Sequence, residues 1–422
     1  MKYIFFLMLW SVQFTQAQTT PPHIKDAKRG LTWNSGYNSF ATWIVNGRNI
    51  VGRTEDHLPL FTMQRFDAYV DFFTANAVIS DTAGYLLFYT NGVMIGDKNK
   101  NIMMSCDTLN PGYWNNNADL GYFAHKAVLI LPQPNHDSMY YVFHNRMYDS
   151  NAGIDSLEGA YYTTVNMNRN NGLGEVVSLR NPITQNSRIA RSVNATRHAN
   201  GRDWWVIIRR CHSDEYLPIL LDPTGVHPQG WQAGMLPQWS PFSYNNFTSQ
   251  DAFSNDGRLF CSNNMSAIGN CITLYDFDRC TGRFSNPRLY NWNDSTYSSA
   301  GCAFSESSQY LYINSSKYMF QCDVTRTNPF GQIDTVGIYD EVPGPHFFEN
   351  VTFGLSQLAA NGKIYNTPFG GSVIYYHVIN NPDLTASNTD FVQRGIELLT
   401  VNASSIPNMP NFCLGPVDGS SQ

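Results

Sequence analysis

The chain has 422 residues, of which 14% are aromatic and 14% are charged, and its net charge is −6. The 27 lysines and arginines form no basic block, which excludes the electrostatic footprint expected of a nucleic-acid-binding protein. Because Tyr, Phe and Trp favour strands, and the 31 glycines and 21 prolines supply many turns, the composition predicts an all-β protein.

The N-terminal residues 1–17 have the pattern of a secretory signal peptide. Lys2 gives a basic start, a mainly apolar stretch runs from Tyr3 to Phe14, and Thr15 and Ala17 are the small residues of a cleavage site. About twelve apolar residues are too few to span a bilayer of about 30 Å, and no later stretch is long and apolar enough to do so. We therefore expect cleavage after Ala17 and a soluble, secreted or cell-surface protein, with the periplasm as the alternative.

The segment SDTAGYLLFYTNG (80–92) joins a polar turn to an aromatic-rich strand, and the same pattern recurs along the chain. With one residue of each turn as a marker, the steps between markers are 53, 64, 56, 51 and 54 residues, with a mean of 55.6. A second strand and turn follow the marker, as in 219–225 and 274–282, so each unit holds two hairpins, or about four strands. The six markers are Gly84, Asp137, Gly201, Gly257, Ser308 and Gly362.

Four strands in roughly 40–55 residues are typical of a blade of a β-propeller, whereas separate sandwich domains would each need about 100 residues. Removing 17 of the 422 residues leaves 405, or 7.3 units of 55.6 residues. We therefore predict a single propeller of seven four-stranded antiparallel blades, with six or eight blades as the alternatives. The seventh blade, which has no marker, would combine the strands after Thr32 with those after Gly371.

The expected domains are a signal peptide at 1–17, a linker at 18–30, the propeller at 31–416 and a tail at 417–422.

Several segments, spread over roughly residues 30–420, resemble a family of secreted propellers found as the N-terminal part of large surface proteins in gliding bacteria with type IX secretion. They are SDTAGYLLFYTNG (80–92), RHANGRDWWVI (197–207), YDFDRCTGRFSNP (275–287), CAFSESSQYLYINS (302–315), LAANGKIY (358–365) and IPNMPNFCLGPVDGS (406–420). The resemblance implies a WD40-like or YVTN-like propeller that is secreted or at the cell surface, and it brings no catalytic mechanism with it. Relatives usually continue into immunoglobulin-like modules and a sorting domain. This sequence ends at Gln422, which leaves a longer parent chain and a different export route both open.

One polar cluster is the main candidate for a ligand site. It comprises the turn RHANGRD (197–203) and the charged end of the following strand, at 209–212. Positive charges at both ends of a strand would line a propeller face and hold an anionic or sugar ligand. The alternative is a packing role, in which Asp203 and the arginines tie adjacent blades together and His198 is hydrogen-bonded in its turn. The candidate residues are Arg197, His198, Arg202, Arg209, Arg210 and His212.

Motifs of catalysis and metal binding are incomplete. The sequence has no G-x-S-x-G nucleophile elbow and no complete P-loop. Asp276 and Asp278 have the spacing of a calcium loop, but Cys280 and Thr281 stand where the next ligand and the glycine belong. Because Asx residues commonly initiate turns, a β-turn is the favoured interpretation. No cofactor is predicted, and calcium is the one metal left open.

All eight cysteines follow the signal peptide, and an even number in an oxidising compartment suggests disulfides. Cys261 and Cys271 fall on what we predict to be adjacent strands of one hairpin. We therefore expect a disulfide between them, which requires Cα atoms about 4.4–6.8 Å apart. Cys280–Cys302 is the second expected bridge.

The sequence thus favours an exported, non-catalytic propeller that binds a surface protein or a glycan. The alternative is a metal-dependent hydrolase or lactonase with its site at the propeller axis, because ligands contributed by different blades leave no local motif. Three or more carboxylate, Asn or His side chains converging on one point of the channel would favour that alternative. An architectural spacer is the third possibility, and it predicts no concave polar pocket.

Overall fold

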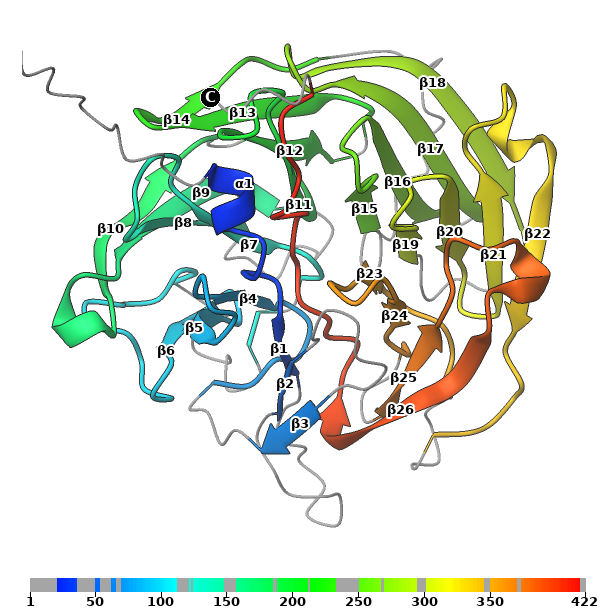
Figure 1. Cartoon of the computed structure of the whole chain (residues 1–422), viewed down its shortest axis with the longest axis horizontal. Helices are drawn as coiled ribbons and strands as arrows, with labels where there is room; N and C mark the ends of the chain where they lie inside the picture. The colour runs from blue at the N-terminus through cyan, green and yellow to red at the C-terminus, as the bar shows by residue number, and fades with distance from the viewer. Residues whose placement is uncertain are drawn as a thin grey trace, which may run out of the picture.

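The computed structural model is an all-β protein whose sheets are arranged in a ring around a central axis, as in a β-propeller (Figure 1). It describes residues 21–35, 50–53, 62–65, 70–111, 121–122, 124–147, 157–184, 187, 189–211, 213–232, 250–266, 269–293, 301–344, 350–369 and 373–417. The predicted signal peptide lies outside these ranges. Helix α1 (Pro22–Lys25) is short, and single 3-10 turns lie at Asn170–Gly172, Pro329–Gly331 and Ala386–Asn388. No helix within the described ranges has the length and apolar character needed to cross a membrane.

Six blades of antiparallel strands make up the ring in the described part of the chain. Blade 1 has three described strands, β4 (Ala77–Ser80), β5 (Leu86–Thr90) and β6 (Ile95–Asp97). The other blades have four strands each, paired in chain order. Blade 2 has β7 (Val128–Pro132), β8 (Met139–Met147), β9 (Leu157–Asn166) and β10 (Glu175–Pro182), and blade 3 has β11 (Ile189–Arg197), β12 (Trp204–Arg210), β13 (Tyr216–Asp222) and β14 (Gly225–Pro228). Blade 4 has β15 (Gln250–Phe253), β16 (Leu259–Ser266), β17 (Gly269–Asp278) and β18 (Arg283–Trp292). Blade 5 has β19 (Gly301–Phe304), β20 (Tyr310–Asn314), β21 (Tyr318–Asp323) and β22 (Ile333–Ile338), and blade 6 has β23 (Ser356–Leu358), β24 (Ile364–Asn366), β25 (Val373–Ile379) and β26 (Phe391–Asn402).

The prediction of seven blades is therefore wrong. The strands after Gly371, β25 and β26, belong to blade 6 rather than to a blade shared by both ends of the chain. The strands after Thr32 form a small separate sheet of β1 (Thr32–Ser35), β2 (Ile50–Arg53) and β3 (Thr62–Arg65). This sheet lies between blades 6 and 1, where β1 contacts β4 and β3 contacts β26 (Figure 1). The prediction failed because it divided all 405 residues after the predicted signal peptide into equal four-stranded units. The described residues before β4 instead form a sheet of three four-residue strands.

All six turn markers lie between the first and second strands of a blade, as the repeat predicts. The first strand of each blade from β4 to β19 contacts the first strand of the next, so these strands surround the axis. The segment 80–92 is accordingly the inner hairpin of blade 1. The marker glycines have positive φ, for example 91° at Gly84 and 72° at Gly257, a backbone conformation that L side chains rarely adopt.

Aromatic and aliphatic side chains hold neighbouring blades together, and strand β12 shows how. Trp204 and Ile208 point into a cluster shared with blades 1 and 2, whereas Trp205 and Ile207 point into a cluster shared with blade 4. This two-residue alternation places both faces of the strand against protein, because successive side chains of a strand point to opposite faces. The aromatic residues of the repeat are therefore mainly core residues, as expected.

Buried asparagines at the ends of second strands add polar links between blades. Asn145 of β8 donates to two carbonyl oxygens of β11, at 3.2 and 2.9 Å. Asn263 of β16 donates to two carbonyl oxygens of blade 5, at 2.8 and 3.1 Å. Asn366 of β24 donates to the Oδ1 atom of Asn314, at 3.2 Å. All four side chains are fully buried, so each satisfies backbone or amide groups that water cannot reach.

The segment after β26, drawn in red, crosses one face of the ring beside α1 (Figure 1). Asn408 anchors this segment to blades 1–3. Its Nδ2 group donates to the carbonyl oxygens of Val128 and Val193, at 3.0 and 2.7 Å. Its backbone N–H donates to the carbonyl oxygen of Asn76, at 2.9 Å. The C-terminal segment thus covers the inner strands of three blades at once.

The expected Cys261–Cys271 disulfide does not fit the strand register. The two cysteines lie on paired strands of one hairpin, as predicted, but Cys261 lies opposite Leu274 and Cys271 lies opposite Asn264. An offset of three residues corresponds to about 10 Å along a strand, beyond disulfide reach, and it places the two side chains on opposite faces. The error arose because β16 continues to Ser266, well past Cys261.

All eight cysteines are free thiols in the structure, including the second expected pair, Cys280 and Cys302. Cys280 is exposed, whereas Cys302 is buried beside Cys261 in the cluster between blades 4 and 5. We expect non-reducing peptide mapping of the purified protein to recover no Cys261–Cys271 peptide. Any bridge found at Cys261 should lead to Cys302. Recovery of a Cys261–Cys271 peptide would show that the hairpin has a different register.

Candidate functional site

The candidate residues predicted from the sequence fall at the two ends of strand β12 and do not form one site. Arg197 ends β11, and the turn 198–203 that follows it leads into β12. Arg209 and Arg210 lie at the far end of β12, about 20 Å away for a strand of this length. His212 lies outside the described residues. The two groups therefore have separate surroundings.

Arg197 is a buried structural residue. Its guanidinium group bonds to the carboxylate of Asp26, donates to the carbonyl oxygen of Arg202 at 2.6 Å, and lies 3.7 Å from the ring centre of Trp204. Burial lowers the pKa of Arg197 to about 10, although Asp26 opposes this shift. Asp26 also pairs with Arg29, at 2.5 Å. This network docks residues 21–30, which the sequence assigned to a linker, onto the propeller.

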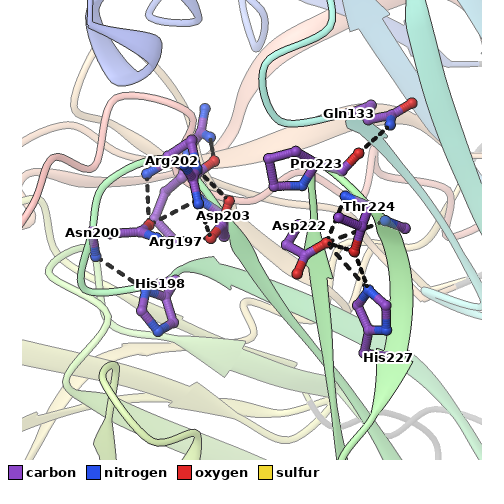
Figure 2. Close-up of polar contacts among 11 residues, drawn as sticks. Gln133, Arg197, His198, Asn200, Arg202, Asp203, Asp222, Pro223, Thr224 and His227 are labelled. Carbon is purple, nitrogen blue, oxygen red and sulfur yellow. Dashed lines mark hydrogen bonds and ion pairs between the residues drawn. The ribbon is translucent and has the colours of Figure 1, made fainter. Parts of the chain in front are cut away.

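The turn after Arg197 is held by its own hydrogen bonds, as Figure 2 shows. Asn200 accepts from the backbone N–H groups of Arg202 and Asp203, both at 3.0 Å. Arg202 forms a two-point pair with Asp203, at 2.7 and 2.9 Å. His198 accepts from the N–H of Asn200 at 3.1 Å and packs against Trp205, with ring centres 5.6 Å apart. These contacts fit the packing role that the sequence left as the alternative.

The arginines at the other end of β12 are also paired. Arg209 is buried and donates to the Oδ1 atom of Asn264 of blade 4, at 2.6 Å. Arg210 pairs with Glu215 at 2.9 Å, and its guanidinium group lies 4.5 Å from the ring centre of Trp231. Both side chains therefore link elements of the fold.

A second polar turn appears in Figure 2, between β13 and β14. The Oδ1 atom of Asp222 accepts from the N–H and the hydroxyl group of Thr224, both at 2.7 Å, and lies 3.2 Å from Nε2 of His227. Partial burial acts to raise the pKa of Asp222, but these hydrogen bonds outweigh it, so that the pKa is lowered. Gln133 of blade 2 donates to the carbonyl oxygen of Pro223, at 3.0 Å, so this turn also joins two blades.

The possible calcium residues, Asp276 and Asp278, bind neighbouring protein groups. Asp276 pairs with Arg288 at 2.5 Å, and Asp278 accepts from the N–H of Cys280 at 2.8 Å and the hydroxyl group of Thr281 at 2.7 Å. The bond from Thr281 is the main cause that lowers the pKa of Asp278. Across the described ranges, no three His, Cys, Asp or Glu side chains are grouped so that they could hold a metal ion.

A cavity at the propeller axis is a different candidate. The sequence placed its alternative, metal-dependent site at the axis, but it named none of the residues that line this cavity as a candidate except Cys302, and that one only for a disulfide. Its volume is about 140 Å³, and it lies between the C-terminal segment 408–413 and the inner strands of blades 3–6. A cavity needs roughly 10–15 Å³ to hold one water, so this one has room for several waters or one compact molecule. Its polar lining includes Lys126, Gln250, Asp251, Cys302, Gln357 and Asn408.

Gln250 fixes the wall of this cavity. Its Oε1 atom accepts from the N–H groups of Cys302 and Ser356, at 3.2 and 2.9 Å, and its Nε2 group donates to the carbonyl oxygen of Ser356 at 2.6 Å. One side chain thus ties the inner strands of blades 4, 5 and 6 together. Asp251, the next residue, accepts from the hydroxyl group of Ser262, and burial raises its pKa. The cavity wall is therefore rigid and polar.

Lys126 is the cationic group of the cavity lining. It precedes strand β7, its backbone has a φ of 54°, and its side chain is buried. The ammonium group donates to the Oε1 atom of Gln357 at 2.9 Å and to the carbonyl oxygen of Pro407 at 3.0 Å. Within the described ranges it pairs with no carboxylate. Burial lowers the pKa of Lys126 to about 7, while the thiol of Cys302 acts in the opposite direction.

This shift predicts a pH dependence of stability. Because the folded-state pKa of Lys126 lies below the usual value of 10.5, the unfolded chain binds the proton more tightly. The free energy of unfolding should therefore rise with pH between about 7 and 10.5 through this group. We expect Lys126→Met to lack this component, so that wild type gains stability relative to the variant between pH 6.5 and 9.5 in urea unfolding. Parallel pH profiles for the two proteins would contradict the burial of a titrating ammonium group.

Sequence reasoning missed Lys126 because its partners are distant in the chain. Gln357 and Pro407 are 231 and 281 residues away. One local signal was present: a lysine stands directly before AVLIL, a run that is too apolar to lie at the surface. A charged residue at the start of a buried inner strand is a reason to search for a cavity or a partner there.

No protein-family model matches the sequence, and no curated protein matches it. Similar solved structures include two candidate 6-phosphogluconolactonases. The one from Bacteroides uniformis has a TM-score of 0.52 and 10% identity, over 89% of this chain and 98% of that one. The one from Bacteroides fragilis has a TM-score of 0.50 and 11% identity, over 89% of this chain and 97% of that one. At such identities the likeness supports the propeller fold alone.

Proposed function

We propose that the chain is an exported, non-catalytic propeller that acts as a binding module at the cell surface and holds a compact polar ligand in its axial cavity. The observation that carries this proposal is the cavity itself. Polar groups from blades 3–6 and from the C-terminal segment converge on about 140 Å³ at the axis. A small set of fixed polar groups in a concave site is typical of ligand-binding pockets.

The fold supports this role in two further ways. Gln250 holds three inner strands in place, so the cavity keeps its shape without a ligand. Sites that are formed before binding lose less conformational entropy when the ligand enters. The turn of Ala360, between the first two strands of blade 6, lies at the cavity and is exposed, which gives the cavity a rim open to solvent.

The test is a thermal-shift and calorimetric screen of the mature protein against amino acids, small dicarboxylates, and neutral and acidic monosaccharides. We expect at least one class to raise the melting temperature in a saturable way. Ala360→Trp, which places a large side chain at the rim, should abolish this binding. Ala83→Trp, in the equivalent exposed turn of blade 1, is the matched control and should bind normally. Binding that survives Ala360→Trp, or no saturable binding by any compound, would refute the axial site.

Export forms part of the same proposal. The N-terminal pattern supports cleavage after Ala17, so the protein recovered outside the cytoplasm should begin at Gln18. Mass spectrometry of the intact protein from culture supernatant and from the cell surface measures this directly. Recovery of chains that retain residues 1–17, or of cytoplasmic protein alone, would contradict export.

A further inference from the structure

We infer that the ligand of the axial cavity carries an anionic group, a carboxylate or a phosphate, and that the ammonium group of Lys126 binds it. This inference rests on the proposed function, because it names the chemistry of the ligand in that same cavity. The observation behind it is a buried cation with no opposite charge beside it. Lys126 is 2% exposed, yet its two hydrogen-bond acceptors are a neutral amide and a backbone carbonyl group.

Burying an ammonium group in a low-dielectric interior is costly unless a counter-charge compensates it. An ammonium group has three N–H donors, and Gln357 and Pro407 accept from two of them. The remaining donor and the uncompensated charge are available to a ligand. An anion would accept the remaining hydrogen bond and also balance the positive charge, whereas a neutral ligand would only accept the hydrogen bond.

The other charged residue of the described lining does not neutralise Lys126. Asp251 lies on β15, accepts from Ser262, and has Arg209 as its charged neighbour. Besides Lys126, the charged and titratable residues of the described lining are Asp251 of β15, Cys302 of β19 and Cys413 of the C-terminal segment, and Cys302 is the one that acts electrostatically on Lys126. The Sγ atom of Cys302 lies 3.2 Å from the carbonyl oxygen of Gln250, to which the thiol donates.

The arrangement also couples binding to pH. Only the protonated amine attracts an anion, and burial brings its pKa to about 7. If the protonated form alone binds, affinity should be about 30-fold lower at pH 8.5 than at pH 6.0. A neutral ligand held by the amide groups of the cavity would show little of this dependence.

The experiment is isothermal titration calorimetry of the mature protein with four probes at pH 6.0 and 8.5. Glucuronate and glucose form a pair that differs in charge at similar size, and succinate and inorganic phosphate separate a carboxylate from a phosphate. We expect an anionic probe to bind at least about tenfold more tightly than glucose at pH 6.0 and to weaken at pH 8.5. Lys126→Met should lose this preference, whereas Lys363→Met, a lysine outside the cavity lining, should keep it.

Lys126→Arg separates charge from folding. It keeps a cation that stays protonated at both pH values, so anion binding should persist while its pH dependence is lost. Circular dichroism and melting temperature establish that each variant is folded. If glucose and glucuronate bind equally, or if folded Lys126→Met binds anions normally, the anionic inference is wrong and the axial binding site stands. If no probe or screened compound binds at all, both proposals fail.

Discussion

Asp26→Asn should lower the free energy of unfolding by about 3–5 kcal/mol, because it leaves two buried guanidinium groups without their carboxylate. Arg29 and Arg197 both bond to Asp26, and their side chains are 3% and 1% exposed. Their other direct contacts are with neutral groups: Arg29 donates to the hydroxyl group of Tyr140 at 2.8 Å, and Arg197 lies over Trp204. Neither partner replaces the lost charge. Urea unfolding at pH 7 measures the difference.

A matched control lies in the same N-terminal region. Asp137 pairs with Lys25 of α1, but its side chain is 85% exposed, so Asp137→Asn should cost less than about 1 kcal/mol. Comparable losses for the two substitutions would show that residues 21–30 are not docked through a buried network. If both substitutions lowered the free energy of unfolding only slightly, residues 21–30 would be a linker, as predicted from the sequence.

Asn263→Leu should lower the free energy of unfolding by about 2–3 kcal/mol. Its Nδ2 group donates to the carbonyl oxygen of Gly301 at 2.8 Å and to that of Asn314 at 3.1 Å, and the site is fully buried. Leucine has a similar size but no donor, so two buried acceptors lose a partner that water cannot replace. The loss should appear in urea unfolding as a lower midpoint with an unchanged slope.

Asn291→Leu is the control for this substitution. Asn291 lies on β18 of the same blade and is exposed, so its replacement should change stability by less than about 0.5 kcal/mol. If Asn263→Leu were equally mild, Asn263 would not be a stabilising link between blades 4 and 5.

The parts of the fold that follow from local chemistry could be predicted from the sequence. Turn residues such as Gly84 and Gly257 adopt positive φ, and the aromatic strands after them are short-range signals, so the all-β class and the four-stranded unit were accessible. The number of blades depends on which strands pair, and the strands after Thr32 gave no sign that they form a small sheet of their own. The strand register could not be predicted either, because nothing in the sequence near Cys261 indicates that β16 continues to Ser266.

The candidate sites show the same limit. The cluster at 197–203 is conspicuous in the sequence because its charges are close together, yet Asp26, which neutralises Arg197, lies 171 residues away. In the sequence, Lys126 is a single charged residue before an apolar run. Its buried environment forms only when folding brings Gln357 and Pro407 to the axis. Pairing across long sequence separations decides whether a charge is structural or available to a ligand.

The most direct test of the axial site is anomalous diffraction from crystals of residues 18–422 soaked in bromide at pH 6.0. Bromide is small enough for the cavity, and its negative charge would balance the positive charge of Lys126, whose described partners are neutral. We predict an anomalous peak inside the cavity, in contact with Nζ of Lys126 and between the C-terminal segment and the inner strands. Bromide confined to surface arginines and lysines, with water alone beside Lys126, would contradict it.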